Sequence, residues 1–165
     1  MSGKLVGTLI GERFVLEALA GSGGMGDVYR ARDRESGQQV AVKVLHAGGH
    51  PHVERFLREA KLLSQLDHPG IVRYIAHGDS PSIYLAMEWL EGEDVGRAVA
   101  RSPFGVHEAL GLTGRVAEAL DAAHRRGVVH RDIKPSTCPL SVIARVPPSR
   151  RAMPKSSSFT RSIAP

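Results

Sequence analysis

Apolar residues in the first ninety positions recur in short runs that have the alternation of β-strands. In residues 39–45 three valines share one face of the run, which leaves Ala41, Lys43 and Leu45 on the other. Turns that contain glycine or proline separate the runs from one another. The pattern predicts five strands, in residues 14–19, in a run through Val28, Tyr29 and Ala31, and in residues 39–45, 71–75 and 83–87.

Two segments have helical spacing instead. Residues 106–126 repeat apolar side chains every three or four positions, although Gly111 and Gly114 weaken the helix and Gly127 ends it. Residues 53–66 form the more clearly amphipathic of the two predicted helices. Its apolar face comprises Val53, Phe56, Leu57, Ala60, Leu62, Leu63 and Leu66.

Glu59 lies within this apolar face, between Leu63 and Leu66, when the helix is drawn at about 100° per residue. A carboxylate is costly to bury alone, so its position predicts a buried cation beside it. Lys43 is the obvious candidate, because a lysine among small and apolar neighbours needs an anionic partner. The alternative is a glutamate at the margin of the helix that reaches water.

A glycine-rich segment, residues 20–27, joins the first two predicted strands. Segments of this kind bind phosphates in two kinds of fold, and in a dinucleotide-binding fold a helix follows the glycines. Here a strand, a turn at Ser36 and Gly37 and a further strand follow, so the glycines cap a hairpin. Because glycine has no side chain, backbone N–H groups of the hairpin would approach nucleotide phosphates closely.

The clearest reactive spacing lies in a short loop, residues 128–135. Two valines lead into His130, and Asp132 is followed by Lys134 two positions later. In this arrangement Asp132 would accept a hydroxyl proton while Lys134 holds a transferring phosphate group beside it. The simpler interpretation is a solvated charged turn, and the rest of the chain decides between the two.

The segments, taken in order, resemble those of protein kinases. The loop matches the kinase catalytic-loop pattern at His130, Arg131, Asp132, Lys134 and Pro135. The motifs GSGGMGDVY and HRDIKPS are together most similar to those of bacterial, eukaryote-like serine/threonine kinases. The resemblance covers about residues 10–136.

This resemblance implies an α+β fold. A kinase small lobe, with a five-stranded antiparallel sheet and one helix, would be followed by only the first helices and the catalytic loop of the large lobe. The implied parts are an N-terminal lead (residues 1–9), the small lobe and hinge (10–90), a partial large lobe (91–136) and a disordered basic tail (137–165).

The resemblance also implies roles for single residues. Asp132 would be the catalytic base and Lys134 a cation beside the phosphate, while Lys43 and Glu59 would clamp the nucleotide. The implied donor is ATP, used with magnesium, and the acceptor is a serine or threonine hydroxyl of a protein substrate. The implied nucleotide-binding residues are Ala20, Gly21, Ser22, Gly23, Gly24, Met25, Gly26, Asp27, Val28, Ala41, Lys43, the gatekeeper Met87, and Glu88 and Leu90 of the hinge.

The chain departs from the kinase pattern directly after the catalytic loop. The family has a magnesium-binding asparagine five residues after the catalytic aspartate, where this chain has Thr137, and no aspartate follows Asp132 to supply the next metal ligand. Loss of metal stabilisation lowers phosphotransfer by orders of magnitude. We therefore expect no metal ligands from this chain and little or no kinase activity from this polypeptide. The alternatives are a non-catalytic nucleotide-binding or interaction module, and an unstable fragment without function.

Composition also changes near the same point. Six of the 22 basic residues and none of the 17 acidic ones lie in residues 133–165, with six of the ten prolines and none of the glycines. Two hypotheses explain this tail: a kinase gene read in a shifted frame, or a genuine truncation with a disordered basic end. Nucleic-acid binding is not expected, because apart from Phe159 no aromatic residue is interleaved with the basic ones.

The composition of the whole chain is that of a globular protein, with 42% hydrophobic and 24% charged residues. The single cysteine, Cys138, excludes an internal disulfide and fits a reducing compartment. No apolar run is long enough for a signal peptide or a membrane span. His46, His50 and His52 are interpreted as solvated loop residues, since no cysteine or acidic group nearby completes a metal site. We expect a soluble, cytoplasmic protein.

Overall fold

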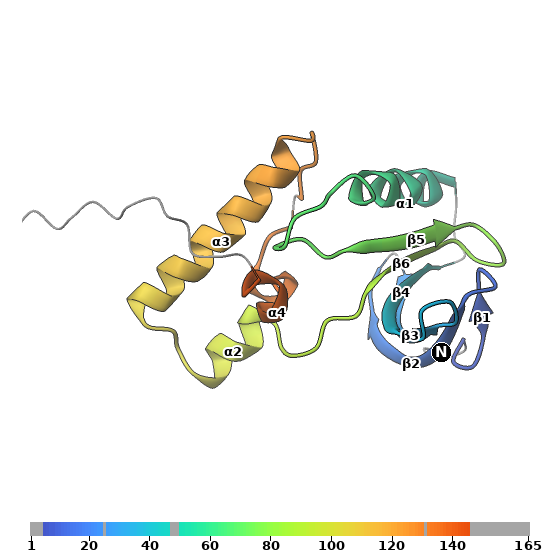
Figure 1. The fold of residues 1–165 in the computed structure, drawn as a ribbon, viewed down its shortest axis with the longest axis horizontal. Coiled ribbons are helices and arrows are strands. Elements are labelled where there is room, and N and C mark those ends of the chain that lie inside the picture. Colours follow the sequence, from blue (N-terminus) through green and yellow to red (C-terminus); the bar gives the residue numbers. More distant parts are fainter. Residues whose placement is uncertain (1–4, 25, 47–49, 131, 146–165) are drawn as a thin grey trace, which may run out of the picture.

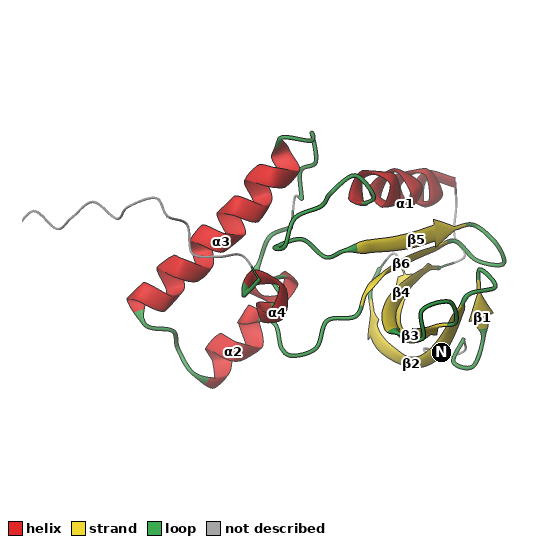
Figure 2. Ribbon diagram, in the orientation of Figure 1, coloured by secondary structure: helices red, strands yellow, loops and turns green. Residues whose placement is uncertain are grey.

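The computed structural model describes residues 5–24, 26–46, 50–130 and 132–145, without the side chains of His50, Pro51, His52, Arg55 and Glu59. The chain forms a curled antiparallel sheet with one helix on its outer face, followed by a group of helices beyond the end of the sheet (Figure 1). Figure 2 shows the strands gathered in one half of the molecule and most of the helices in the other. The predicted α+β fold is confirmed.

The sheet has six strands in the order β1-β2-β3-β4-β6-β5, one more than predicted. The additional strand is β1, which has only two residues and pairs with β2. The chain turns back between these strands at Gly11 and Glu12, which both have positive φ. Two residues are too few to show alternation in the sequence. The bounds are β1 Leu9–Ile10, β2 Phe14–Ser22, β3 Gly26–Asp33, β4 Gln39–Leu45, β5 Tyr74–Gly78 and β6 Tyr84–Glu88.

Strand β4 separates two hydrophobic cores, as its alternation predicts. Val40, Val42 and Val44 face the inside of the curled sheet, where a T-shaped pair formed by Phe14 and Tyr84 also lies. Apolar side chains from five strands fill this first core. Its buried members are Ile10, Phe14, Leu16, Tyr29, Ala31, Val40, Val42, Val44, Tyr84 and Ala86.

The second core lies on the opposite face of the sheet, under helix α1 (His50–Leu63). Phe56 and Ala60 of the helix pack there on Leu45 of β4 and Leu85 of β6. The helix begins and ends three residues earlier than predicted, and residues 64–66 continue as turns. Pro51 fits the first turn of a helix, where its missing N–H group costs nothing.

The fourth predicted strand begins and ends three residues later in the structure than the sequence predicted. Residues 71–75 were expected to be extended, whereas β5 comprises Tyr74–Gly78. The turn that follows α1 reaches further than expected, because the Ile71 N–H donates to the His68 carbonyl at 2.9 Å and the Gly70 N–H to the His68 ring at 3.1 Å. Local hydrogen bonds of this kind compete with strand pairing.

Four helical segments follow the sheet: α2 (Val95–Arg101), α3 (Val106–His124), the 3-10 turn η1 (Pro135–Thr137) and α4 (Leu140–Ile143). Of these, only α3 was predicted. Residues 137–145 were assigned to a disordered tail, but Val142 and Ile143 are 2% and 5% exposed, and α4 contacts α3. That part of the prediction was wrong, and residues 146–165 lie outside the described residues.

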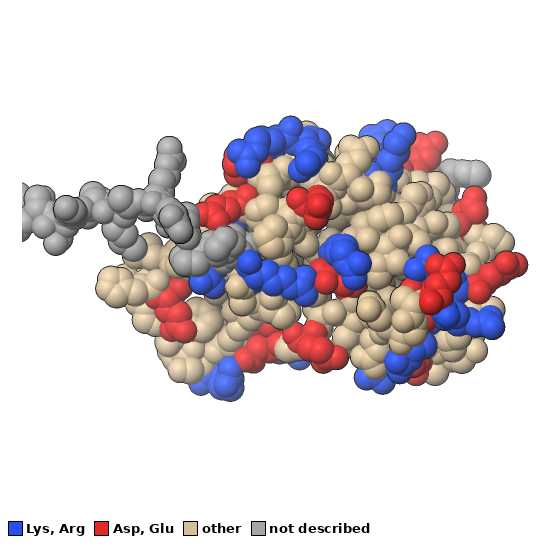
Figure 3. All heavy atoms as spheres, viewed as in Figure 1, with Lys and Arg blue, Asp and Glu red and all other residues tan. Residues whose placement is uncertain are grey.

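The described surface carries both signs of charge. Figure 3 shows basic and acidic side chains interspersed over the sheet and the helices on the face in view. Among the described helices, none combines the length and the hydropathy that crossing a membrane requires.

Candidate nucleotide and catalytic site

The glycine-rich hairpin is formed by the end of β2 and the start of β3. Gly21 pairs with Val28 and Ser22 with Asp27, and the register shifts by one residue at Ala20. The Ser22 hydroxyl donates to Asp27 Oδ1 at 2.5 Å, which closes the hairpin from its side. That hydrogen bond, aided by His46 and opposed by burial, holds the pKa of Asp27 below its usual range. The described residues on the two sides of the predicted phosphate-binding segment are therefore paired with each other.

The glycines of this turn differ in what surrounds them. Gly23 and Gly26 exchange backbone hydrogen bonds of 3.0 and 3.4 Å. A side chain at Gly26 would overlap the Val44 carbonyl oxygen, so β4 requires this glycine. A Cβ atom at Gly24 would meet nothing within 4 Å, which leaves room for a ligand against the backbone. Met25 lies outside the described residues.

Lys43 lies in the middle of β4, between Val28 of β3 and Leu85 of β6. Its side chain is half-buried on the face of the sheet that α1 covers, with Nζ 5.6 Å from the centroid of the Phe56 ring. The predicted pair with Glu59 lies outside the described residues, because only the backbone of Glu59, in α1, is placed. Helix α1, which carries the predicted partner Glu59, is thus the helix that contacts Lys43 through Phe56.

The hinge residues follow on the neighbouring strand. Ala41 pairs with Met87 and Val40 with Glu88, so the predicted adenine-side residues are direct neighbours in the sheet. Among the described residues, none accepts a hydrogen bond from the backbone N–H of Leu90. An N–H group of this kind in an extended segment can bind the edge of a purine base.

Glu88 is held in place from two sides. Its Oε1 atom accepts the backbone N–H of Arg73 at 2.9 Å and Nη1 of Arg145 at 2.7 Å, while its own N–H donates to the Arg73 carbonyl at 3.0 Å. Burial raises the pKa of Glu88, but the bonds from Arg145 and Arg73 outweigh it, and the pKa lies below its usual value. Glu88 is therefore an ionised, fixed carboxylate at the end of β6.

The catalytic-loop residues belong to the segment after α3. Lys134 Nζ lies 3.0 Å from Asp132 Oδ2, and the two side chains are 53% and 65% exposed. Both groups face solvent, where an ion pair contributes little stability and is easily exchanged for a ligand. Arg131 lies outside the described residues. The structure thus keeps Asp132 and Lys134 together and open to solvent.

Thr137 binds the backbone of the same loop. Its hydroxyl accepts the Lys134 N–H at 3.0 Å and has two carbonyl acceptors in reach for its single proton, Asp132 at 3.0 Å and Lys134 at 2.9 Å. The Thr137 N–H also donates to the Lys134 carbonyl at 2.9 Å. The hydroxyl that stands where the kinase pattern has asparagine is therefore used to hold the loop.

These features correspond to a known domain. Residues 14–138 match the protein kinase domain. The chain belongs to the protein kinase family. The match runs from the start of β2 to the residue after η1, so it includes the glycine hairpin, Lys43, the hinge and the catalytic loop of this kinase chain.

The kinase chain is similar to bacterial serine/threonine protein kinases. It is 42% identical to Pkn2 of Myxococcus xanthus over 137 residues, which are 81% of this chain and 16% of Pkn2. It is 38% identical to PrkC of Bacillus subtilis over 136 residues, 79% of this chain and 21% of PrkC. The crystal structure of the Mycobacterium tuberculosis PknI kinase domain superposes with a TM-score of 0.68 at 31% identity, over 79% of this chain and 56% of that domain. The chain therefore spans a minor part of the two full-length relatives.

The described residues do not fit the magnesium site that the kinase family implies. The Thr137 hydroxyl is bonded to the loop backbone, and the Asp132 carboxylate is paired with Lys134. Within the ranges that the structure describes, no three acidic, histidine or cysteine side chains are grouped to hold a metal ion. Hard divalent cations need several oxygen ligands, and this loop offers too few.

A cavity of about 200 Å³ lies apart from the residues that are predicted to bind the nucleotide. Apolar side chains of α3, of α4 and of the loop after α1 line it, together with His130 at the start of the catalytic loop. None of the glycine hairpin, Lys43 or the hinge contributes to its wall. The cavity and the predicted nucleotide-binding residues are therefore separate parts of the described chain.

Two ion pairs that hold the kinase chain together were not predicted. Arg13 Nε and Nη2 donate to the two carboxylate oxygens of Asp33 at 2.8 Å each, and Asp33 is 2% exposed. The bonds from Arg13, with a smaller contribution from Ser36, hold the pKa of Asp33 well below its usual range. The other pair joins Arg145 to Glu88. Partners 20 and 57 residues apart leave no periodic signal in a sequence.

Proposed function

We propose that this chain is the ATP-binding and catalytic-loop part of a protein serine/threonine kinase, and that the polypeptide alone binds nucleotide with little or no phosphotransfer. The observation that carries the proposal is the register of three strands. It sets Val28 beside Lys43 and Ala41 beside Met87, so phosphate-side and adenine-side residues form one continuous surface. The open space at Gly24 fits a nucleotide on that surface, and so does a Leu90 N–H that donates to no acceptor within the part of the chain that the structure describes.

Each group would have a defined task on bound ATP. The N–H groups of the glycine hairpin and the ammonium of Lys43 would bind the phosphates, while the Leu90 N–H would bind the adenine edge. A serine or threonine hydroxyl of the protein substrate would attack the terminal phosphorus and give its proton to Asp132. The new oxygen–phosphorus bond forms as the bond to ADP breaks, and Lys134 offsets the charge on the phosphoryl oxygens.

Thr137 is the reason that we propose little turnover. Its hydroxyl supports the loop backbone and is not free to bind a metal that would stabilise the transferring phosphate. Metal stabilisation lowers the barrier by several kcal/mol, and a tenfold loss in rate corresponds to about 1.4 kcal/mol. Binding of the nucleotide depends on other residues and would be retained.

The test measures binding and transfer separately on the 165-residue chain. Calorimetric titration with magnesium-ATP should show saturable binding, and labelled ATP with a serine-rich protein should give little or no labelled product. An Asp132→Asn variant should bind ATP as the unchanged chain does, because the proposal assigns Asp132 to the acceptor hydroxyl and not to the nucleotide. Strong labelling that disappears in Asp132→Asn would overturn the proposed loss of turnover, and absence of ATP binding would overturn the proposed nucleotide site.

A second candidate function is that of a non-catalytic interaction module that binds a kinase partner. It is favoured by exposed apolar side chains on α3, where Val106 is 75% and Leu110 54% exposed. Such side chains, when grouped, favour contact with another protein. Binding of a partner kinase that is lost in Leu110→Asp and retained in Lys43→Met would support this function over nucleotide binding.

A further inference from the structure

The segment that follows the catalytic loop, residues 138–145, is attached to the chain just beyond the hinge. The Val95 N–H donates to the Cys138 carbonyl at 3.0 Å, and the Leu140 N–H donates to the Glu93 carbonyl at 3.1 Å. Asp94 and Pro139 form the antiparallel bridge between these two bonds. We call residues 138–145 the strap. Its first half is thus paired, residue by residue, with the connection between β6 and α2.

The second half of the strap is fixed by apolar packing. Val142 and Ile143 of α4 are 2% and 5% exposed, and α4 contacts α3. Side chains as buried as these do not leave their positions without exposing apolar surface to water. The strap is therefore anchored on the helical part of the molecule at the point where Arg145 begins to extend from it.

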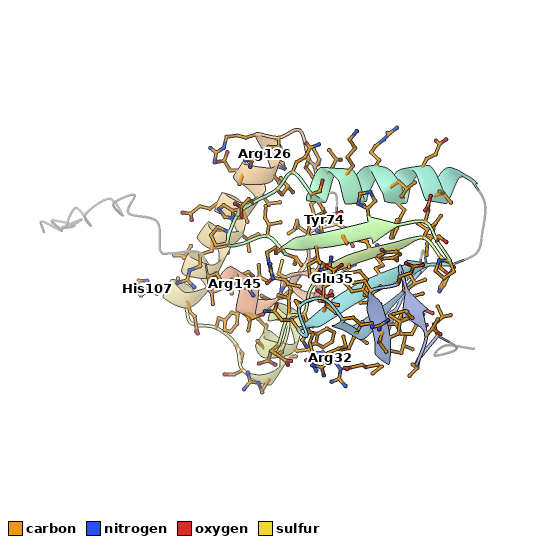
Figure 4. All side chains as sticks on the ribbon, turned by 45° about the vertical axis from the view of Figure 1, so that its right-hand side comes forward. Arg32, Glu35, Tyr74, His107, Arg126 and Arg145 are labelled. Carbon is orange, nitrogen blue, oxygen red and sulfur yellow. The ribbon has the colours of Figure 1, made fainter. Side chains whose placement is uncertain are left out.

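Arg145 crosses from the strap to the sheet. Its Nη1 atom lies 2.7 Å from Oε1 of Glu88, whose side chain is only 13% exposed. Figure 4 shows Arg145 between the helical part and the strands. A charge-assisted bond to a largely buried carboxylate is stronger than a surface ion pair and restricts both partners. Through it, an anchored helix holds the last residue of β6.

We propose that Arg145 is a positioning residue for nucleotide binding, which acts through Glu88 to hold the hinge backbone in the conformation that presents the Leu90 N–H. This inference rests on the proposed function, because the hinge is the adenine side of the nucleotide site. The strap residues follow the catalytic loop in the sequence, yet Arg145 acts on the hinge, which is the adenine side of the site. Restricting the hinge before the ligand arrives lowers the ordering cost of binding.

The amide hydrogens of Arg73 and Glu88 test the strap directly in the chain without nucleotide, because the first is bonded to the Glu88 carboxylate and the second to the Arg73 carbonyl. In Arg145→Gln we expect exchange of these two amides to accelerate roughly tenfold, with strands β2 and β3 unchanged. Arg145→Lys keeps the charge and should restore most of the protection. Arg125→Gln removes an exposed ion pair to Asp121 and is the matched control, which should leave the hinge as it is.

Nucleotide affinity supplies the second readout. Magnesium-ATP should bind roughly three- to tenfold more weakly to Arg145→Gln than to Arg125→Gln. If Arg145→Gln does not fold, Glu88→Gln decides, because it keeps an acceptor for the Arg73 N–H and removes the charge that Arg145 binds, and it should accelerate exchange at positions 73 and 88 in the same way. Exchange at these two positions that is equal in Arg145→Gln and Arg125→Gln, or unchanged in Glu88→Gln, would overturn the inference. If the unchanged chain binds no nucleotide, the proposed function fails, whereas hinge exchange still decides the role of Arg145.

Discussion

The hydroxyl of Thr137 accepts the backbone N–H of Lys134 at 3.0 Å, which couples a non-catalytic side chain to the loop that carries Asp132. The backbone bond between the same two residues, at 2.9 Å, reinforces the turn. Thr137 thus has a structural task that explains how the loop keeps its form without the asparagine of the kinase pattern. This coupling leads to the first prediction.

Thr137→Val should loosen the catalytic loop. The valine leaves the Lys134 N–H without its acceptor and should lower the free energy of unfolding by about 1 kcal/mol. Urea denaturation measures that change, and the amide exchange of Lys134 shows where it arises. Thr137→Ser keeps the hydroxyl and should behave as the unchanged chain. Thr113→Val removes an exposed hydroxyl that bonds only to the Ala109 carbonyl within α3, so an equal loss there would contradict the special role of Thr137.

Lys43→Met should abolish most nucleotide binding without unfolding the chain. A cation bound to phosphate contributes about 1.5–3 kcal/mol, so affinity for magnesium-ATP should fall roughly ten- to a hundredfold. The methionine keeps the packing on Phe56, so the melting temperature should change little. Calorimetric titration measures the ATP affinity of Lys43→Met and of a control, Lys61→Met, which removes an exposed lysine in the last turn of α1. Equal affinities in the two variants would place the phosphates elsewhere.

Asp33→Asn should destabilise the fold in a way that depends on pH. Removing the charge breaks the paired bonds from Arg13 and should cost about 2–4 kcal/mol at neutral pH. The pKa of Asp33 is lowered in the folded chain, so its contribution is complete above the unfolded value of about 4 and is lost as the pH falls below that value.

Chemical denaturation at several pH values measures the difference between the unchanged chain and Asp33→Asn. The difference should be constant from neutral pH down to about 5 and shrink in more acidic solution. Asp121→Asn, which affects an exposed pair with Arg125, should cost less than about 1 kcal/mol at every pH. A difference for Asp33→Asn that grows on acidification would have the wrong sign for this account.

Gly26→Ala should damage the glycine hairpin, and Gly24→Ala should not. A methyl group at Gly26 would overlap the Val44 carbonyl oxygen, so the backbone of β3 or β4 must move, at a cost of about 1–3 kcal/mol. At Gly24 the space is open, and stability should stay within about 0.5 kcal/mol. Thermal melts of both variants make the comparison. Equal melting temperatures would mean that the hairpin adapts freely.

The sequence was sufficient where one residue pattern decides one element. The alternation in residues 39–45 predicted both the bounds of β4 and the faces of its side chains, and helical spacing located α1 and α3 to within three residues. The pattern failed where short-range hydrogen bonds compete with it. Because of the turn at His68, β5 begins three residues later in the sequence than predicted. Helix α2 was missed for another reason: the Asp94 carboxylate accepts the Arg97 N–H at 2.9 Å and begins a helix of seven residues, which is too short to show a period.

Composition misled the prediction for residues 137–145. Prolines and basic residues dominate the average of the whole tail, and that average conceals the three apolar residues Leu140, Val142 and Ile143, which are enough to anchor one turn of helix. The candidate site was predicted from motifs alone, so the assigned roles of its residues stay predictions. The supporting pairs, Arg13 with Asp33 and Arg145 with Glu88, depend on tertiary contacts that no local pattern indicates.

The two cores on opposite faces of β4 limit how this strand can change in evolution. Inserting or deleting one residue within it would reverse every following side chain, moving Lys43 into the inner core and a valine under α1. Substitutions that preserve size and polarity are compatible with both cores, whereas changes in length are not. Related kinases should therefore vary in the number of residues in the turn between β3 and β4, but never within β4 itself.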